Sequence, residues 1–137
     1  VYEAMDALDT YLAKCGLEES LMHLVRLRAS QINGCAYCID MHTKDARAVG
    51  ETEQRLYALT AWRDTAFFSP REMAALAFTE SVTLMATDHV PQEAYDAVAA
   101  EFSADEVAAL VSLIVAINAW NAIGVSTHVW NPGSYQP

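Results

Sequence analysis

Apolar residues recur at spacings of three and four along most of the chain, and no stretch alternates strictly between apolar and polar residues. A period near 3.6 is typical of helices with one buried face, whereas strict alternation is typical of strands. The pattern therefore predicts an all-α protein, a bundle of six to seven helices. The expected helices cover about residues 5–12, 18–33, 35–49, 53–62, 70–87, 91–99 (a short one) and 104–125.

Helix boundaries are marked by capping signals. Ser69 is followed three residues later by Glu72, and Ser103 by Glu106. Each pair is a capping box, in which the serine and the glutamate satisfy free backbone N–H groups at a helix start. Gly50 stands where a glycine ends a helix in the left-handed conformation. The turn-rich residues 131–137 are expected to be irregular.

The helix expected at 104–125 is apolar almost all round and approaches the length of a membrane span. Asn118 and Asn121 lie inside it, acidic residues precede it, and no Lys or Arg flanks it. We therefore interpret it as a buried helix and expect no membrane partner. A domain this small has few layers to cover such a helix, so a subunit interface and a homo-oligomer are expected.

Chain length and charge limit the number of domains and the classes of partner that this protein can have. The chain has 137 residues, enough for one domain spanning 1–137, with 8 Lys+Arg against 18 Asp+Glu and a formal charge of −10. No basic cluster is present, which argues against nucleic acid as a partner. The first residues lack the pattern of a secretory signal, and three cysteines do not make a disulfide scaffold. A cytoplasmic protein is expected.

The chemistry-bearing residues are Cys35, Cys38 and His42, which a helix would place at i, i+3 and i+7 on one face. The helix N-terminus favours a thiolate at Cys35, whereas His42, four residues after Cys38, favours Cys38 as the nucleophile. These residues alone leave both assignments open. In either case the second thiol resolves the sulfenic acid or mixed disulfide, which predicts a two-thiol redox cycle.

Two other interpretations of these residues stay open. Cys35, Cys38 and His42 supply three of the four ligands of a structural zinc, with His23 or His128 as the fourth, although no second CxxC is present. A zinc-binding or redox-sensing module is the corresponding function. The cysteines could also be small apolar groups in the core.

The segments Leu24–Gln31 and Cys35–His42 resemble the signature of the alkylhydroperoxidase AhpD-like branch of the carboxymuconolactone decarboxylase family. Similarity continues at Ala74–Glu80 and Ile117–Asn121, so it covers about residues 21–125. The resemblance implies an all-helical subunit, assembled as a homotrimer or homohexamer, that reduces a peroxide without cofactor or metal. By the same match, Cys38 attacks the peroxide, Cys35 resolves, His42 is the base, and a reductant protein or small thiol restores the pair.

Two positions depart from the family pattern. His23 stands where the AhpD-type relay has a glutamate, and Tyr37 stands where some members have a histidine. A histidine can still relay protons, so His23 is a candidate relay residue, with a surface or interface histidine as the alternative. Glu80 is a candidate compensating carboxylate whose pKa burial would raise if it points to the thiols, and a solvated edge residue otherwise. A non-redox lactone decarboxylase is a further alternative, although such members generally lack the cysteine pair.

Overall fold

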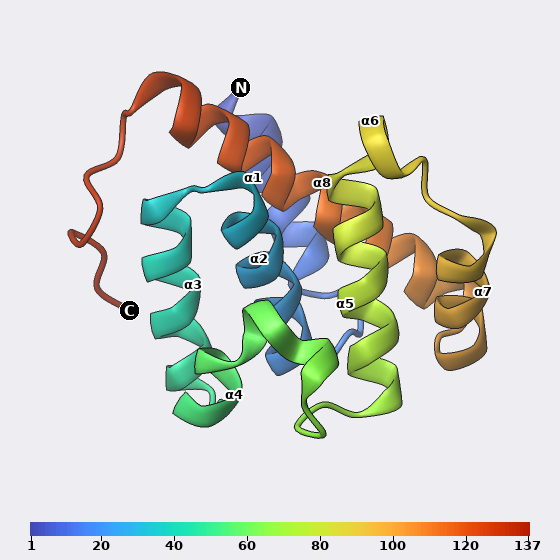
Figure 1. The fold of residues 1–137 in the computed structure, drawn as a ribbon. Coiled ribbons are helices and arrows are strands. Elements are labelled where there is room, and N and C mark those ends of the chain that lie inside the picture. The colour runs from blue at the N-terminus through green and yellow to red at the C-terminus, as the bar shows by residue number, and fades with distance from the viewer.

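Helix α2 (Glu19–Asn33) lies at the centre of the fold, with α3 (Ala36–Ala48), α5 (Pro70–Thr83) and α8 (Ala104–Thr127) packed around it (Figure 1). The computed structural model describes residues 1–137, and it contains helices and no strand. The all-α prediction is confirmed. The remaining elements are α1 (Tyr2–Leu12), α4 (Glu53–Tyr57), the 3₁₀ helix η1 (Leu59–Asp64), α6 (Met85–Asp88) and α7 (Gln92–Glu101).

Helix α2 is central because it buries two faces. Leu21 and Val25 pack into the larger core cluster, which α1, α5, α7 and α8 complete. Leu24 and Leu27 pack into a second cluster with side chains of α4, η1 and α5. Burial of a leucine side chain contributes about 2 kcal/mol, so the two faces together fix α2 against both halves of the fold.

Both predicted capping boxes are present. The hydroxyl of Ser69 accepts from the backbone N–H of Glu72, whose carboxylate accepts from the N–H of Ser69, and Ser103 and Glu106 make the same reciprocal bonds. Gly34 ends α2 with φ 68°, a left-handed conformation that glycine adopts at little cost. This sharp turn sends the chain directly into α3.

Two predicted helices are each divided in the structure. The helix expected at 53–62 separates at Ala58 into α4 and η1, and the helix expected at 70–87 ends at Thr83, where Leu84 leaves helical geometry before the short α6. Leu84 and Met85 are exposed. No buried face therefore holds the second helix past Thr83, although the apolar spacing continues in the sequence.

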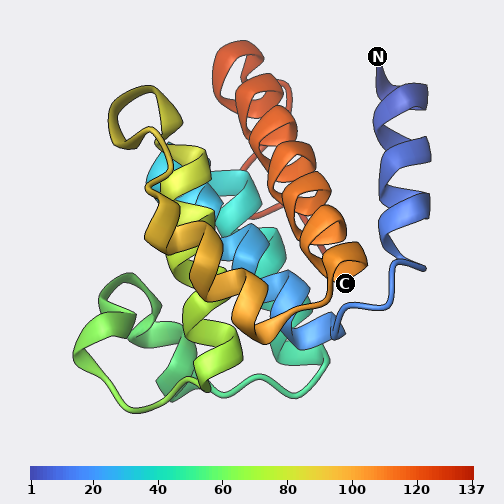
Figure 2. The ribbon, with the colours of Figure 1, turned by 90° about the vertical axis from the view of Figure 1, so that its right-hand side faces the viewer.

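Helix α8 has the length and apolar composition of a membrane span, and an 18-residue stretch of it has a mean hydropathy of 1.9. One side of it packs against α2, α5 and α7, and α1 lies along it on the outside (Figure 2). The interpretation of α8 as a buried core helix is confirmed on that side. On another side Val111 and Val115 are 36% and 53% exposed, so the isolated chain leaves part of this apolar helix uncovered.

The C-terminal segment, residues 128–137, is irregular, which confirms the prediction for residues 131–137, and it runs back along α3 (Figure 1). The Tyr135 hydroxyl donates to Asp45 at 2.6 Å, and Lys44 Nζ donates to the Tyr135 carbonyl at 3.0 Å. These bonds attach the segment to α3 and hold it over the end of α8.

Candidate active site

Cys35 and Cys38 form a disulfide at the N-terminus of α3. Cys35 is the N-cap residue, with extended backbone, and its sulfur accepts from the Cys38 backbone N–H at 3.3 Å. The two side chains are 3% and 4% exposed, and their Cα atoms are 5.3 Å apart. The sequence spacing thus places both sulfurs on one turn, where they bond without rearrangement of the helix.

A cavity of about 250 Å³ lies on the Cys38 side of the disulfide. Cys38 and His42 both line it, one helical turn apart on α3. Its remaining wall is mainly apolar and aromatic, consisting of Asp9, Tyr37, Met41, Ile117, Trp120 and Trp130. A small apolar molecule in this cavity would contact both a sulfur and an imidazole.

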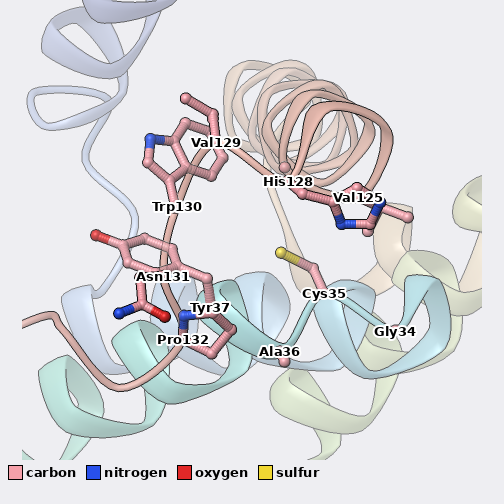
Figure 3. A pocket seen from close by; sticks show the side chains of 11 residues that line it. Gly34, Cys35, Ala36, Tyr37, Val125, His128, Val129, Trp130, Asn131 and Pro132 are labelled. Atoms are coloured by element: carbon pink, nitrogen blue, oxygen red, sulfur yellow. The ribbon is translucent and has the colours of Figure 1, made fainter.

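A larger cavity, about 390 Å³, lies on the Cys35 side, between the end of α8 and the C-terminal segment. Figure 3 shows the Cys35 sulfur directed toward this space, with His128 and Trp130 around it. A Cβ atom on Gly124 would lie 2.9 Å from the Trp130 ring and 3.4 Å from the Cys35 sulfur. The absence of a side chain at Gly124 therefore lets Trp130 lie this close to α8.

Trp130 belongs to the walls of both cavities. Its indole centroid lies 5.5 Å from that of Tyr37 and 5.8 Å from that of Trp120, and Trp120 stacks on Tyr2 at 6.0 Å. Aromatic pairs at these separations contribute about 1 kcal/mol each beyond burial. Sequence reasoning missed Trp130, because its position in an irregular segment gives no periodic signal.

His42 and His23 face each other across the α2–α3 contact, with ring centroids 6.3 Å apart. Burial, then the positive charge of Arg26 and the neighbouring His23, lower the pKa of His42 to about 3. Burial and Arg26 also lower the pKa of His23, against the opposing charges of Asp45 and Glu19. Both imidazoles are therefore neutral at neutral pH, and the structure brings His23 to His42 and away from the surface.

Arg26 is a charged neighbour of both histidines that sequence reasoning missed. Burial lowers its pKa, and the carboxylates of Asp9 and Asp45 oppose that shift. The guanidinium nonetheless stays protonated, because its unperturbed pKa is above about 12. A fixed positive charge thus acts on the histidine pair. Sequence reasoning missed Arg26 because it belongs to no recognisable motif in α2.

Glu80 does not join the cysteine pair. Its carboxylate accepts from Arg28 at 2.8 Å, from Trp62 at 3.2 Å and from Arg63, and it lines neither of the two cavities beside the disulfide. Burial alone would raise the pKa of Glu80, but these hydrogen bonds outweigh it and lower the pKa. The expectation that Glu80 is a carboxyl with raised pKa beside the thiols is wrong. Its carboxylate pairs with Arg28 and Arg63, away from the disulfide.

The donor set of the zinc alternative is not assembled in this form of the protein. The sulfurs of Cys35 and Cys38 are bonded to each other, and His128 is exposed at the rim of the larger cavity. Asn121, one of the two polar residues inside the apolar helix α8, is fully buried: it donates to Ser30 and accepts from Asn33, both at 3.0 Å. These bonds join α8 to the last turn of α2, which ends just before Cys35.

The chain is similar to a protein from Bacillus subtilis and to several solved structures. YdfG of Bacillus subtilis (strain 168), an uncharacterised protein, is 43% identical over 119 residues, which span 87% of this chain and 81% of YdfG. The crystal structure of ATU0492 from Agrobacterium tumefaciens, a protein of unknown function suggested to be the antioxidant defence protein AhpD, has a TM-score of 0.92 at 38% identity. That match covers 96% of this chain and 90% of ATU0492.

More distant structures share the fold. The debrominase Bmp8, solved in complex with 2,3,4-tribromopyrrole, has a TM-score of 0.85 at 17% identity, covering 96% of this chain and 70% of Bmp8. A peroxidase-related protein from Silicibacter sp. TM1040 has a TM-score of 0.84 at 18% identity, over 97% of this chain and 71% of that protein. The sequence model of one family matches residues 1–81. The chain therefore belongs to the carboxymuconolactone decarboxylase family.

Proposed function

We propose that this protein is a thiol-dependent peroxidase of the alkylhydroperoxidase type, with Cys38 and Cys35 as its redox pair. The observation that carries the proposal is that Cys38 shares one cavity with His42 while its sulfur is bonded to Cys35. The chain's similarity to ATU0492, suggested to be an antioxidant protein, supports the same class of activity. The active form for peroxide is the dithiol, and the disulfide is its oxidised product.

The first step is attack of the Cys38 thiolate on the terminal oxygen of a hydroperoxide, ROOH. The O–O bond breaks, Cys38 becomes a sulfenic acid, and the alkoxide leaves as ROH after it takes a proton. His42 lies one turn from Cys38 in the same cavity, so its neutral ring passes the thiol proton to the leaving oxygen in a concerted relay, in which one ring nitrogen accepts a proton as the other donates one. The two electrons that reduce the peroxide come from the sulfur.

In the second step Cys35 attacks the sulfenic sulfur of Cys38, and water leaves as the disulfide forms. A dithiol protein or two small thiols then supply two electrons and two protons to restore the pair. The reductant attacks from the 390 Å³ cavity, since Cys35 faces that cavity. That attack on Cys35 breaks the S–S bond and releases Cys38 as the thiolate. A second thiol then attacks the mixed disulfide and releases Cys35, whose thiolate the Cys38 N–H stabilises.

His23 extends the proton path from His42. The ring separation of 6.3 Å suits a short path between neutral imidazoles, through one water or a small rotation. Arg26, whose charge disfavours an imidazolium at His42, favours an anion nearby, and Cys38 carries that anion when it is a thiolate. His23 thus takes the place of the relay glutamate, and Arg26 supplies electrostatic stabilisation.

The substrate class follows from the lining of the Cys38 cavity. Three aromatic side chains, with Met41 and Ile117, surround the sulfur and the imidazole. Such a lining favours an organic hydroperoxide with an apolar group over hydrogen peroxide, because apolar surface buried there contributes about 25 cal/mol per Å².

Single-cysteine variants test the assignment of the two sulfurs. In Cys35→Ser, one equivalent of cumene hydroperoxide should produce a sulfenic acid at Cys38 that dimedone traps, with one burst of ROH and no further turnover. Cys38→Ser should neither consume peroxide nor be labelled. Cys15→Ser, which removes the free cysteine outside the site, should turn over like the wild type with a thiol reductant.

Two outcomes would contradict the proposal. A dimedone adduct on Cys35 in Cys38→Ser, with none on Cys38 in Cys35→Ser, would reverse the roles of the sulfurs. Peroxide consumption at the wild-type rate in both single variants would show that the pair is not the redox centre.

A further inference from the structure

We propose that His23, His42 and Asp45 form a binding site for Zn²⁺ that is separate from the cysteine pair. Each of the three offers a ligand atom, and these atoms all lie within 4.8 Å of one another. His23 comes from α2, while His42 and Asp45 come from α3. Two imidazoles and one carboxylate are a donor set that zinc takes in proteins, with a water or a further carboxylate as the fourth ligand.

The histidines keep nitrogen atoms available for a metal. His23 and His42 are 7% and 6% exposed, and the Nδ1 atoms of both are buried without a hydrogen-bond partner. An unpartnered buried polar atom costs about 1–3 kcal/mol, so a pair of them on facing rings calls for a ligand between the helices. Zn²⁺ is a ligand that accepts electron pairs from both rings at once.

Asp45 is positioned as a ligand by the C-terminal segment. Its Oδ1 accepts from the Tyr135 hydroxyl at 2.6 Å, and its second oxygen has no hydrogen-bond partner in the protein. A carboxylate that is hydrogen-bonded through one oxygen and free at the other is the arrangement in which outer hydrogen bonds orient a metal ligand.

The local charge suits a divalent cation. Arg26 is the positive group whose charge acts on both histidines, and the carboxylates of Asp9, Asp45 and Glu19 act on Arg26 with the opposite sign. Glu19 also lies 3.9 Å from His23 Nε2. One guanidinium and three carboxylates leave a net charge of −2 around neutral imidazoles, which Zn²⁺ balances.

The geometry needs a small closure to bind the ion. Bonds of about 2.0–2.1 Å to a tetrahedral zinc place ligand atoms about 3.3 Å apart. The three donor atoms lie within 4.8 Å of one another in the structure. Side-chain rotations that move each donor atom by about an ångström therefore bring them to the distances that zinc requires. His42 lines the 250 Å³ cavity, which gives the ion a route to the triad.

The site does not depend on the proposed peroxidase function, because it uses no sulfur. In the disulfide form Cys35 and Cys38 do not ligate, so binding to oxidised protein isolates the histidine and aspartate ligands. Zinc on His42 would remove the free nitrogen that the peroxidase cycle uses. A loaded protein is therefore inhibited as a peroxidase, while zinc binding is measurable whether or not the protein has that activity.

The test is titration of oxidised, metal-free protein with ZnCl₂ by calorimetry, and with CoCl₂ by visible absorption. One Zn²⁺ per chain is expected, with the intense visible bands of tetrahedral Co²⁺. Asp45→Asn and His23→Gln should each weaken Zn²⁺ binding by at least about 100-fold, and Tyr135→Phe by about tenfold. His89→Asn and His128→Gln, at exposed histidines, should bind as tightly as the wild type.

The proposal is overturned if the oxidised protein binds no Zn²⁺, or if Asp45→Asn and His23→Gln bind it as tightly as the wild type. It is also overturned if His89→Asn or His128→Gln abolishes binding, since the ion would then be elsewhere. Circular dichroism and Tm identify a variant that does not fold. If His23→Gln fails to fold, Asp45→Asn and Tyr135→Phe, which alter less buried groups, still decide the outcome.

Discussion

The imidazole of His42 faces the imidazole of His23 across the α2–α3 contact, with their centroids 6.3 Å apart and neither Nδ1 hydrogen-bonded. Both rings are buried, and Arg26 stands near them. A buried pair in this setting stays neutral, since a proton on either ring would be poorly solvated and would be repelled by the guanidinium. Neutral rings have lone pairs free to bind metal and can pass a proton only by accepting one as they donate another, and their burial makes the fold sensitive to acid.

We expect the metal-free protein to lose stability as pH falls from about 7 toward 4. The unfolded His42 titrates near 6.5 and the folded one at about 3, so between these values the unfolded state binds the extra proton. The contribution of His42 to the free energy of unfolding should fall by about 2 kcal/mol between pH 6 and pH 4.5. Above about pH 7 this contribution should be constant. Urea unfolding with EDTA at several pH values measures this.

The matched comparison is His42→Asn against His89→Asn, which changes an exposed histidine in the left-handed conformation that asparagine tolerates. His42→Asn should flatten the fall in stability between pH 6 and pH 4.5, whereas His89→Asn should retain it. Equal slopes in all three proteins would show that His42 does not titrate on unfolding.

Asn121→Ala should destabilise the protein by about 3 kcal/mol. The variant removes the acceptor of Asn33 and the donor to Ser30, and it leaves a cavity in a fully buried position between α2 and α8. Equilibrium urea unfolding measures the loss, with Ser126→Ala, an exposed position on the same helix, as the control. A loss below about 0.5 kcal/mol would mean that these bonds contribute little net stability.

The local signals in the sequence predicted the helical scaffold well. The capping boxes at Ser69 and Ser103 correctly marked the first turns of α5 and α8. Breaks at Ala58 and Leu84 were missed because periodicity shows where a helix is possible, while burial decides where it persists.

Gly124→Ala should displace Trp130 and expose Cys35. The new Cβ would lie 2.9 Å from the Trp130 ring, which is the movable end of a side chain, so the ring shifts and α8 stays helical. Iodoacetamide should alkylate Cys35 of the reduced variant several-fold faster than in the wild type, with altered tryptophan fluorescence. Ala122→Ser, at an exposed position of α8, should change neither. Unchanged alkylation would show that Trp130 does not shield Cys35.

We expect this chain to form a trimer or hexamer that covers the exposed valines of α8. Val111 and Val115 are separated by one helical turn, and both are exposed on the long apolar helix α8. Replacing both with serine should lower the sedimentation coefficient to that of a monomer, while Val129→Ser, an exposed valine outside the helix, should not. If the wild-type protein sediments as a monomer at micromolar concentration, the expected trimer or hexamer is wrong.

The candidate site was predictable where its residues are close in sequence. Cys35, Cys38 and His42 share α3, so their spacing indicated that they lie together. Arg26, Trp130 and Tyr135 join the site through packing of α2 and the C-terminal segment on α3, and no local pattern encodes such contacts. Glu80 was misassigned for the same reason: its arginine partners come from α2 and η1. Asp45 was missed although it lies three residues after His42 on α3, a spacing that puts both on one helix face.

The redox role of the cysteine pair is tested most directly by counting thiols and weighing the protein around one reaction with peroxide. Fully reduced wild-type protein has three thiols, Cys15, Cys35 and Cys38. One equivalent of cumene hydroperoxide should leave one thiol, lower the mass by about two hydrogens and place the disulfide between Cys35 and Cys38 in a peptide map. Three remaining thiols with the peroxide unconsumed, or oxidation confined to Cys15, would contradict the account.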